Sequence, residues 1–174
     1  MSMSSTMEEG TARCRDGSPL SPAQANRRRW LSVLARASLG ELDTVLSVIK
    51  DIIGSVPAAH YLRKPEIGMA MVRGRMGGTG RPFNFSEMTM TRCTLQLDDG
   101  RLGCAYIAGR KKSEAERVAL IDALLQDAVH GDRLIAQTID PLAAEQAGRA
   151  KARIARSAPT KVEFFTLVRE ENPA

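Results

Sequence analysis

The sequence predicts an α+β domain in which a mostly antiparallel sheet is covered by about four helices. Two capped helical segments come first, strand-like runs joined by a hairpin signal follow, and helical patterns return after residue 110. Helices and strands segregated along the chain are typical of α+β folds, whereas a parallel sheet needs strands that alternate with helices. The chain has 174 residues, which suits a single domain.

The first two helices are predicted from their capping residues. Residues 21–24 (Ser-Pro-Ala-Gln) offer an N-cap serine, a proline at the first helical position and a capping-box glutamine. A second capping box at residues 38–41 precedes apolar residues at helical spacing, and Gly54 can end that helix. Residues 1–20 show no apolar period, so we expect a disordered N-terminal tail and an ordered domain over residues 21–170. The paired helices are expected to cover a sheet.

The strands of that sheet are predicted between residues 61 and 108. Strand-like segments cover residues 61–64, 67–75, 88–97 and 102–108, and Asp99-Gly100 is a strong hairpin signal. A two-residue turn there places six side chains on one apolar face. The expected pairs are Leu97 with Leu102, Leu95 with Cys104, and Cys93 with Tyr106.

The segments after residue 110 predict two more helices and a closing strand. Ser113 and Glu116 form a third capping box ahead of an apolar stripe. Asp140 followed by Pro141 predicts the start of a fourth helix that runs to about residue 157. Residues 161–169 are apolar at both parities, which predicts a strand buried on two faces.

The charge of the chain favours anionic partners. The formal net charge is +5 and the sequence pI is near 9.4, which suits nucleic acid, phosphorylated metabolites or an acidic partner protein. Aromatic residues make up only 4% of the chain, and no basic run alternates with aromatic residues. The stacking platforms of a single-strand binder are therefore not predicted, and we expect no nucleic-acid partner.

The cysteines and the hydropathy pattern indicate a cytoplasmic protein. Cys14, Cys93 and Cys104 are odd in number and lack CxxC spacing, which argues against a disulfide framework and a compact zinc site. No apolar run approaches the roughly 18 residues of a membrane span. We expect no bound metal, no membrane association and a reducing, cytoplasmic location.

A glycine-rich stretch and three arginines are the candidate ligand contacts. Residues 75–80 read Arg-Met-Gly-Gly-Thr-Gly, and their backbone N–H groups could approach a phosphate, although the ending of a P-loop is missing. A flexible loop or interface turn is the alternative. Arginines at strand ends could hold phosphate or phosphonate through bidentate hydrogen bonds, or could form surface ion pairs. The residues assigned to substrate or phosphate contact are Arg75, Gly77, Gly78, Gly80, Arg92 and Arg110.

No residue pattern identifies a catalytic centre, so the catalytic residues are unknown. Glu116 and Asp122 are acids within a predicted helix, where capping or solvation explains them. Arg149, Arg153 and Arg156 form a basic stripe on the fourth helix beside a line of alanines. That stripe either faces water or docks an acidic partner.

An ordered series of motifs resembles the PhnG family from residue 29 to the end of the chain. In chain order the matching stretches are RWLSVLA at 29–35, RMGGTG at 75–80, TR at 91–92, DG at 99–100 with LG at 102–103, GR at 109–110, AER at 115–117, ALIDAL at 119–124 and VEFFTLVR at 162–169. A series of this length is far more specific than any one of its motifs.

The resemblance implies an accessory, non-catalytic subunit of the carbon–phosphorus lyase core complex of organic phosphonate catabolism. Its expected partners are the H, I and J subunits, in two copies each, with a functional link to the L protein. The system makes α-D-ribose 1-methylphosphonate 5-triphosphate from ATP and methylphosphonate and releases adenine. It uses MgATP, while an iron–sulfur cluster and S-adenosylmethionine belong to a partner, so this chain is expected to bind no cofactor. The alternative is a free-standing phosphate- or nucleotide-binding protein that uses the loop at 75–80.

Overall fold

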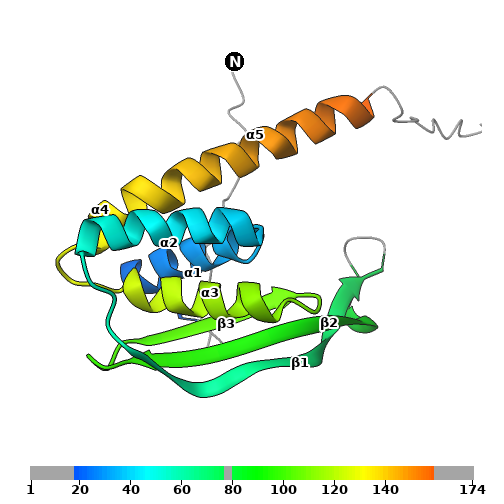
Figure 1. Ribbon diagram of the computed structural model, residues 1–174. Coiled ribbons are helices and arrows are strands. Elements are labelled where there is room, and N and C mark those ends of the chain that lie inside the picture. The colour runs from blue at the N-terminus through cyan, green and yellow to red at the C-terminus, as the bar shows by residue number, and fades with distance from the viewer. Residues whose placement is uncertain (1–17, 77–79, 159–174) are drawn as a thin grey trace, which may run out of the picture.

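The computed structural model describes residues 18–76 and 80–158, and it has the predicted α+β architecture (Figure 1). Its single sheet is antiparallel, with the strand order β1-β2-β3. The predicted closing strand at 161–169 lies outside the described residues. The elements in chain order are α1 (Pro22–Leu34), α2 (Leu39–Ile53), β1 (Ala59–Arg75), β2 (Pro82–Leu97), β3 (Leu102–Ala108), α3 (Lys112–Leu124), α4 (Gly131–Leu134), the π-helix η1 (Ile135–Ile139) and α5 (Asp140–Ser157).

The first two helices begin at the predicted capping boxes. Ser21 Oγ accepts a hydrogen bond from the Gln24 N–H (3.2 Å), and the Ser21 N–H donates to Gln24 Oε1 (2.9 Å). The Ser38 N–H donates to Glu41 Oε2 at 2.7 Å in the same manner. Gly54 ends α2 with a φ of 74°, a conformation that favours glycine. Both caps and the glycine stop are confirmed.

The predicted capping box of α3 is wrong. The helix begins at Lys112, and its N-cap residue, Lys111, makes no side-chain capping hydrogen bond. A tertiary contact sets this start, because the Lys111 backbone N–H donates to Thr91 Oγ1 on β2 at 2.9 Å. That hydroxyl in turn donates to the Gly109 carbonyl (2.6 Å), so β2 fixes the turn that leads into α3.

Asp140 does not begin a separate helix. The chain is helical from Gly131 to Ser157, and the π-helical segment η1 connects α4 to α5 immediately before Pro141. Proline has no backbone N–H, and its ring clashes with the carbonyl four residues earlier in a regular helix. Local widening of the helix relieves such a clash, so the helix continues through Pro141 where the sequence predicts a new start.

The first two predicted strand segments form one strand, β1. It pairs with β2 from Ala59 to Arg75, and its register shifts near Arg63 and again after Val72. Pro65 lies within the first irregular region. A proline is tolerated there because β1 is an edge strand, where one backbone side forms no ladder.

The β2–β3 hairpin has a three-residue turn, and the predicted pairing is wrong by one residue. The Leu97 N–H donates to the Arg101 carbonyl (2.9 Å), and Gly100 has a φ of 91°. Leu95 therefore faces Gly103 and Cys93 faces Ala105, while Tyr106 lies on the opposite face and is 61% exposed. A one-residue slip moves every side chain of a strand to the other face.

The observed register brings glycine to the closest approach between the sheet and α3. A Cβ atom on Gly103 would lie 1.9 Å from the Ala119 carbonyl oxygen, which no side chain could tolerate. Ala105 and Ile107 follow on the same face and are buried. The three-residue turn thus lets the helix settle against the small residues of β3.

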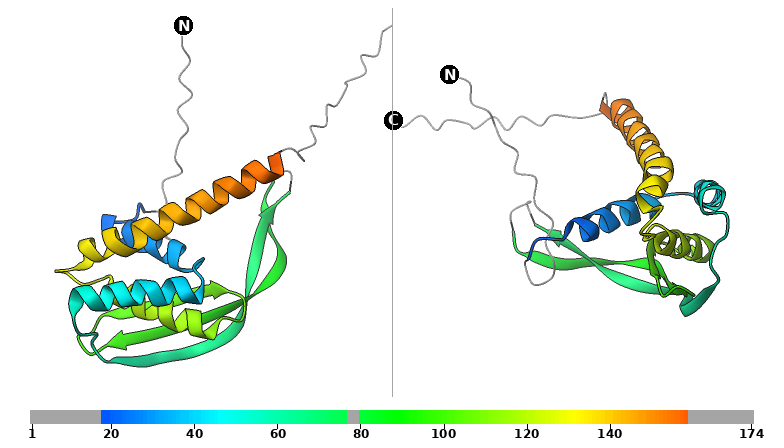
Figure 2. Two further views of the ribbon diagram at one scale, coloured as in Figure 1. Left: turned by 45° about the horizontal axis from the view of Figure 1, so that its top comes forward. Right: turned by 90° about the vertical axis from the view of Figure 1, so that its left-hand side faces the viewer.

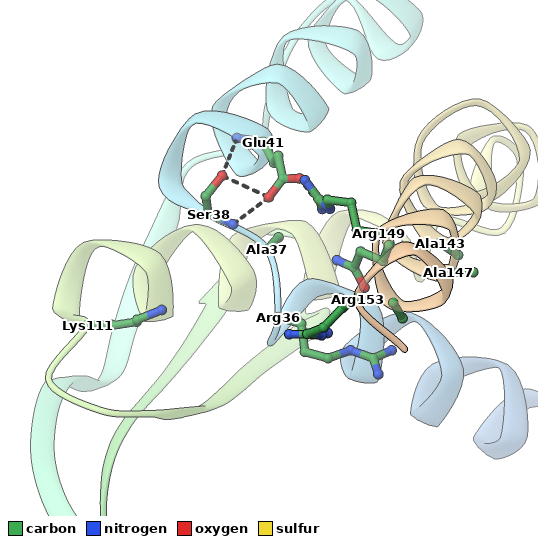
Figure 3. Close-up of a pocket in the computed structure, with 11 residues that line it drawn as sticks. Arg36, Ala37, Ser38, Glu41, Lys111, Ala143, Ala147, Arg149 and Arg153 are labelled. Carbon is green, nitrogen blue, oxygen red and sulfur yellow. Dashed lines mark hydrogen bonds and ion pairs between the residues drawn. The ribbon is translucent and has the colours of Figure 1, made fainter. Parts of the chain in front are cut away.

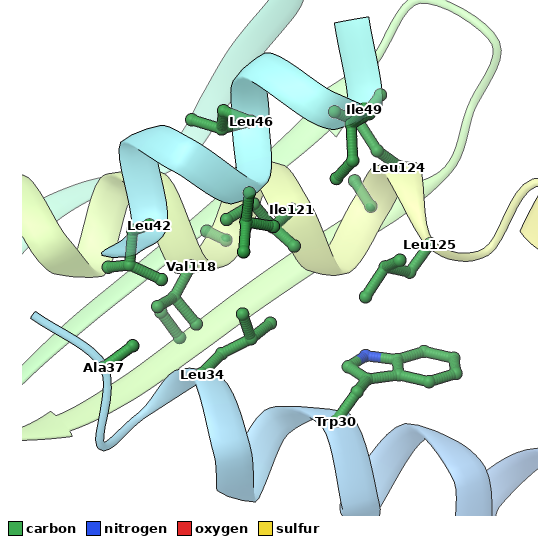
Figure 4. Close-up of a cluster of buried hydrophobic side chains, with 14 of the residues drawn as sticks. Trp30, Leu34, Ala37, Leu42, Leu46, Ile49, Val118, Ile121, Leu124 and Leu125 are labelled. Atoms are coloured by element: carbon green, nitrogen blue, oxygen red, sulfur yellow. The ribbon is translucent and has the colours of Figure 1, made fainter. Parts of the chain in front are cut away.

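The helices form layers above one face of the sheet (Figure 1). Helix α3 packs directly on the sheet, whereas α1 and α2 pack mainly on α3, so the helical pair does not cover the sheet itself as expected. Figure 4 shows the apolar core between these helices. Its largest fully buried side chains include Leu34, Leu42, Ile49, Ile121 and Leu124.

One end of the β1–β2 hairpin projects beyond the helices (Figure 2). We call this part the arm and define it as residues 67–75 of β1 and 82–89 of β2. Every residue of β2 from Pro82 to Thr89 is exposed, whereas buried residues begin at Thr91. Strand β2 therefore has a covered half and an uncovered half, whereas the edge strand β1 has no buried residue.

Candidate functional site

A buried polar network joins α1, β3 and α3 around Asp122. The side chain of Asp122 is fully buried, and its oxygens accept hydrogen bonds from Arg27 Nη2 (2.7 Å), Trp30 Nε1 (2.8 Å) and the Cys104 N–H (2.9 Å). The hydrogen bond to Asp122 raises the pKa of the Arg27 guanidinium. The sequence suggested capping or solvation for Asp122, but its buried side chain is not solvated. Its contacts are all internal, which gives Asp122 a structural role in joining α1 and the edge strand β3 to α3.

Glu116 also has a role that the sequence did not indicate. Its Oε1 accepts a hydrogen bond from the Tyr61 hydroxyl on β1, so it does not cap α3. This hydrogen bond is the main cause that raises the pKa of Tyr61 to about 12. The contact ties the middle of α3 to the edge strand of the sheet.

The predicted phosphate-binding stretch lies at the tip of the arm. Gly77 and Gly78 fall outside the described residues. Arg75 is the last residue of β1, and its Nη1 donates to the Gly80 carbonyl at 3.2 Å. The Gly80 N–H donates to the Met76 carbonyl, and a Cβ atom on Gly80 would lie 2.7 Å from that oxygen. Gly80 is thus required for the close turn at this position.

The other two predicted contacts lie elsewhere on the sheet. Arg92 is at the middle of β2 and forms an exposed ion pair with Glu66 (2.6 Å), and the hydrogen bonds from Arg63 and then Arg92 lower the pKa of Glu66. Arg110 is exposed in the turn between β3 and α3. Arg75 pairs with Pro82, ten residues from Arg92 along β2, so about 30 Å of strand separates them. The structure does not bring the three arginines together, and their contact with substrate stays a prediction.

The arm carries exposed apolar side chains on both faces, and those of β1 continue the core face of the sheet. Met69 lies opposite Thr89 and Met71 opposite Glu87, in the same alternation that buries Cys93 and Leu95 farther along β2. Met69 is 74% exposed and Phe85 is 67% exposed. The register shift after Val72 pairs Phe83 with Gly74, and a Cβ atom on Gly74 would lie 3.9 Å from Phe85 Cβ, so both phenylalanines lie on the other face. We call the exposed apolar residues of the arm, on its two faces together, the arm face; its members are Ile67, Met69, Met71, Phe83 and Phe85.

Such a surface is typical of a site for protein association. A monomeric protein rarely exposes a contiguous group of large apolar side chains, and methionine and phenylalanine are enriched at protein interfaces. Methionine also adapts its shape to a partner. The sequence shows these residues, but only the structure shows that the helices stop short of them.

The two described cysteines are free thiols. Cys93 is buried on the helix side, and burial raises its pKa to about 11, while Cys104 lies beside Asp122 and burial raises its pKa as well. Within residues 18–76 and 80–158 no group of three or more potential ligands (His, Cys, Asp or Glu) could hold a metal ion. In that same part of the chain, no helix is both long and apolar enough to cross a membrane.

The fold and the arm face define the class first: a small α+β protein with a surface suited to association. Two comparisons with known proteins then show the family to which the chain belongs. Residues 25–170 match the family model described as phosphonate metabolism protein PhnG. The chain is also 40% identical over 151 residues to the alpha-D-ribose 1-methylphosphonate 5-triphosphate synthase subunit PhnG of Rhizobium meliloti (strain 1021), which covers 85% of this chain and 92% of that protein. The chain belongs to the PhnG family of phosphonate metabolism proteins.

Proposed function

We propose that this protein is an accessory subunit of the carbon–phosphorus lyase core complex. In this role it is needed to make α-D-ribose 1-methylphosphonate 5-triphosphate from ATP and methylphosphonate, with release of adenine. The observation that carries the proposal is the 40% identity, over nearly the whole relative, to a protein named as a subunit of the corresponding synthase. The uncovered arm face supports it independently, because a subunit needs a surface on which to assemble.

The partners in this proposal are the H, I and J subunits, with two copies of each subunit in the complex and a functional link to the L protein. MgATP is the cosubstrate of the complex, and an iron–sulfur cluster and S-adenosylmethionine are assigned to a partner. The acids that the sequence offered are engaged internally, since Asp122 binds Arg27 and Trp30 and Glu116 binds Tyr61. This supports a chain that organises the complex while its partners carry the chemistry.

We assign the arm face as the surface of this chain that contacts a partner subunit. Burial of a methionine or phenylalanine side chain contributes about 1.5–3 kcal/mol each. The arm tip is also basic, with the exposed Arg73, Arg75 and Arg81 beside the apolar residues. A partner surface with an apolar centre and an acidic rim would complement it.

Co-expression tests the proposal. The chain, tagged at one end, is produced with the H, I and J subunits, and the purified material is sized by light scattering and assayed for adenine release from ATP and methylphosphonate in the presence of the L protein. We expect a large stoichiometric complex whose synthase activity is lost when this chain is omitted. A stable lone monomer that recovers no partner, or full activity without this chain, would contradict the proposal.

A further inference from the structure

A basic cleft lies among the α1–α2 connection, the first turn of α2, the N-cap residue of α3 and α5 (Figure 3). It has a volume of about 770 Å³, within the range of small-molecule sites. Figure 3 shows Lys111 at the start of α3, Arg36 after α1, and Arg149 and Arg153 on α5 around this space. The arginine stripe predicted on the fourth helix is therefore partly turned toward other helices.

Small side chains on α5 leave the cleft open. Ala143, Ala147 and Ala150 line it from that helix. Two polar contacts hold α5 at this distance: Arg149 Nη2 donates to Glu41 Oε1 of α2 (2.6 Å), and Gln146 Nε2 donates to the Val33 carbonyl of α1 (3.1 Å). The space is thus framed by fixed elements.

The charges of the cleft are predominantly positive. Glu41 is the one acidic side chain among its lining residues, and hydrogen bonds from the Ser38 backbone and then from Arg149 lower its pKa to about 2, so it is ionised at neutral pH. Arg149 offsets that charge. Arg36, Lys111 and Arg153 form no ion pair with any residue in the described part of the chain, and all three are exposed. Three cations around one cavity are left to bind a ligand.

The helix that begins at the cleft adds to the positive potential. Helix α3 has 13 residues, and no side chain caps its N-terminus at Lys111. The N-terminal end of a helix carries a partial positive charge and favours phosphate groups. This end acts together with the Lys111 ammonium and the two arginines, which supply donors that match phosphate oxygens.

We infer that this cleft binds the triphosphate group of a ribose or nucleoside triphosphate. The choice of a triphosphate rests on the proposed function, since the relative is named for a 5-triphosphate product. The three unpaired cations favour a polyanionic ligand independently of the proposed function. The site is separate from the glycine-rich stretch at 75–80, which lies at the tip of the arm. It gives this subunit a direct part in holding the substrate or the product.

The test is calorimetric titration of the purified full chain with tripolyphosphate and, separately, with ATP. Arg36→Ala and Arg153→Ala each remove one unpaired cation. The matched control is Arg156→Ala, which removes the same charge from the same helix outside the cleft. Loss of one charged hydrogen-bond donor weakens binding by about tenfold or more, whereas we expect less than a twofold change in the control. Binding should also weaken with added salt.

Equal binding of tripolyphosphate and ATP would show that the site recognises the phosphates alone, and tighter binding of ATP would show that it also contacts the nucleoside. The inference is overturned if neither compound binds, or if Arg36→Ala, Arg153→Ala and Arg156→Ala behave alike. It is also overturned if Arg36→Glu and Arg153→Glu prevent assembly with the H, I and J subunits, because the cleft would then dock an acidic partner segment. If Arg36→Glu and Arg153→Glu assemble with the partners but no longer bind the triphosphate, both this site and the proposed function are supported. If the unmodified chain assembles but binds neither compound, only the site is overturned.

Discussion

The covered half of β2 and the arm have opposite surroundings, although apolar residues continue from one to the other on the core face as far as Met71. In the covered half, Leu95 and Leu97 of β2 are at most 3% exposed because α3 packs over them. In the arm, Met69 occupies the equivalent side of the sheet and is 74% exposed, and Phe85, on the other side after the register shift, is 67% exposed. Alternation alone therefore identifies a face that is to be buried, but it does not say whether the chain itself or a partner buries it.

The buried network that holds the covered half together should show the largest effect. Asp122→Ala leaves the Trp30 and Cys104 donors without their acceptor and Arg27 without its counter-ion, so we expect a loss of about 3–5 kcal/mol in the free energy of unfolding. Urea denaturation followed by circular dichroism measures it. Asp122→Asn, which keeps an acceptor, should cost less. A loss below about 1 kcal/mol in Asp122→Ala would show that the network is not needed.

A core truncation in the covered half should have the next largest effect. Leu95→Ala removes a side chain that is 3% exposed against α3, and buried leucine-to-alanine changes cost about 2–4 kcal/mol. The same denaturation assay applies. If Leu95→Ala were as mild as a change in the arm, the distinction between the two halves would fail.

The capping carboxylate of α2 should give a smaller, pH-dependent effect. Because the pKa of Glu41 is lowered from 4.5 to about 2 in the folded protein, its contribution to stability is complete above about pH 4.5 and is lost as the pH falls through 2. Glu41→Gln should therefore cost about 1 kcal/mol near neutral pH, with a difference from the unmodified protein that shrinks toward pH 2. Glu145→Gln, on the exposed side of the same arginine, is the control. A cost that does not change with pH would contradict this explanation.

The smallest effect on stability is expected in the arm. Met69→Ser and Phe85→Ser replace side chains that already contact water in the isolated chain, so the free energy of unfolding should change by no more than about 0.5 kcal/mol. Thermal and urea unfolding of the lone chain measure it. A loss comparable with that of Leu95→Ala would mean that the arm is packed against this chain in solution.

Local signals in the sequence predicted the parts of the fold that depend on local interactions. The capping boxes at Ser21 and Ser38 and the stop at Gly54 form within a few residues of chain, and all are confirmed. The start of α3 depends on Thr91, and the register of β3 depends on the fit of Gly103 against Ala119. Those contacts join residues that are far apart in sequence, so no local pattern could indicate them.

The candidate sites also divide into features that local sequence predicts and features that only the packing of distant segments produces. Arg75, Arg92 and Arg110 were singled out by their predicted places at strand ends, and the sheet spreads them apart. The cations of the basic cleft come from the end of α1, the start of α3 and the middle of α5, and only the packing of these helices brings them to one cavity. Ile67, Met69 and Met71 of the arm face were assigned to a strand, whereas Phe83 and Phe85 lie in the part of β2 that precedes the predicted start at residue 88. The exposure of all five follows from where the helices end.

The central claim is that the arm, the uncovered end of the β1–β2 hairpin, binds a partner subunit. It is tested most directly by co-expressing the tagged double variant Met69→Ser/Phe85→Ser with the H, I and J subunits, beside Val129→Ser, which changes an equally exposed apolar residue outside the arm. We predict that the arm variant recovers at least about tenfold less partner protein than the unmodified chain, while Val129→Ser recovers the full amount. Full recovery by the folded arm variant would contradict the claim.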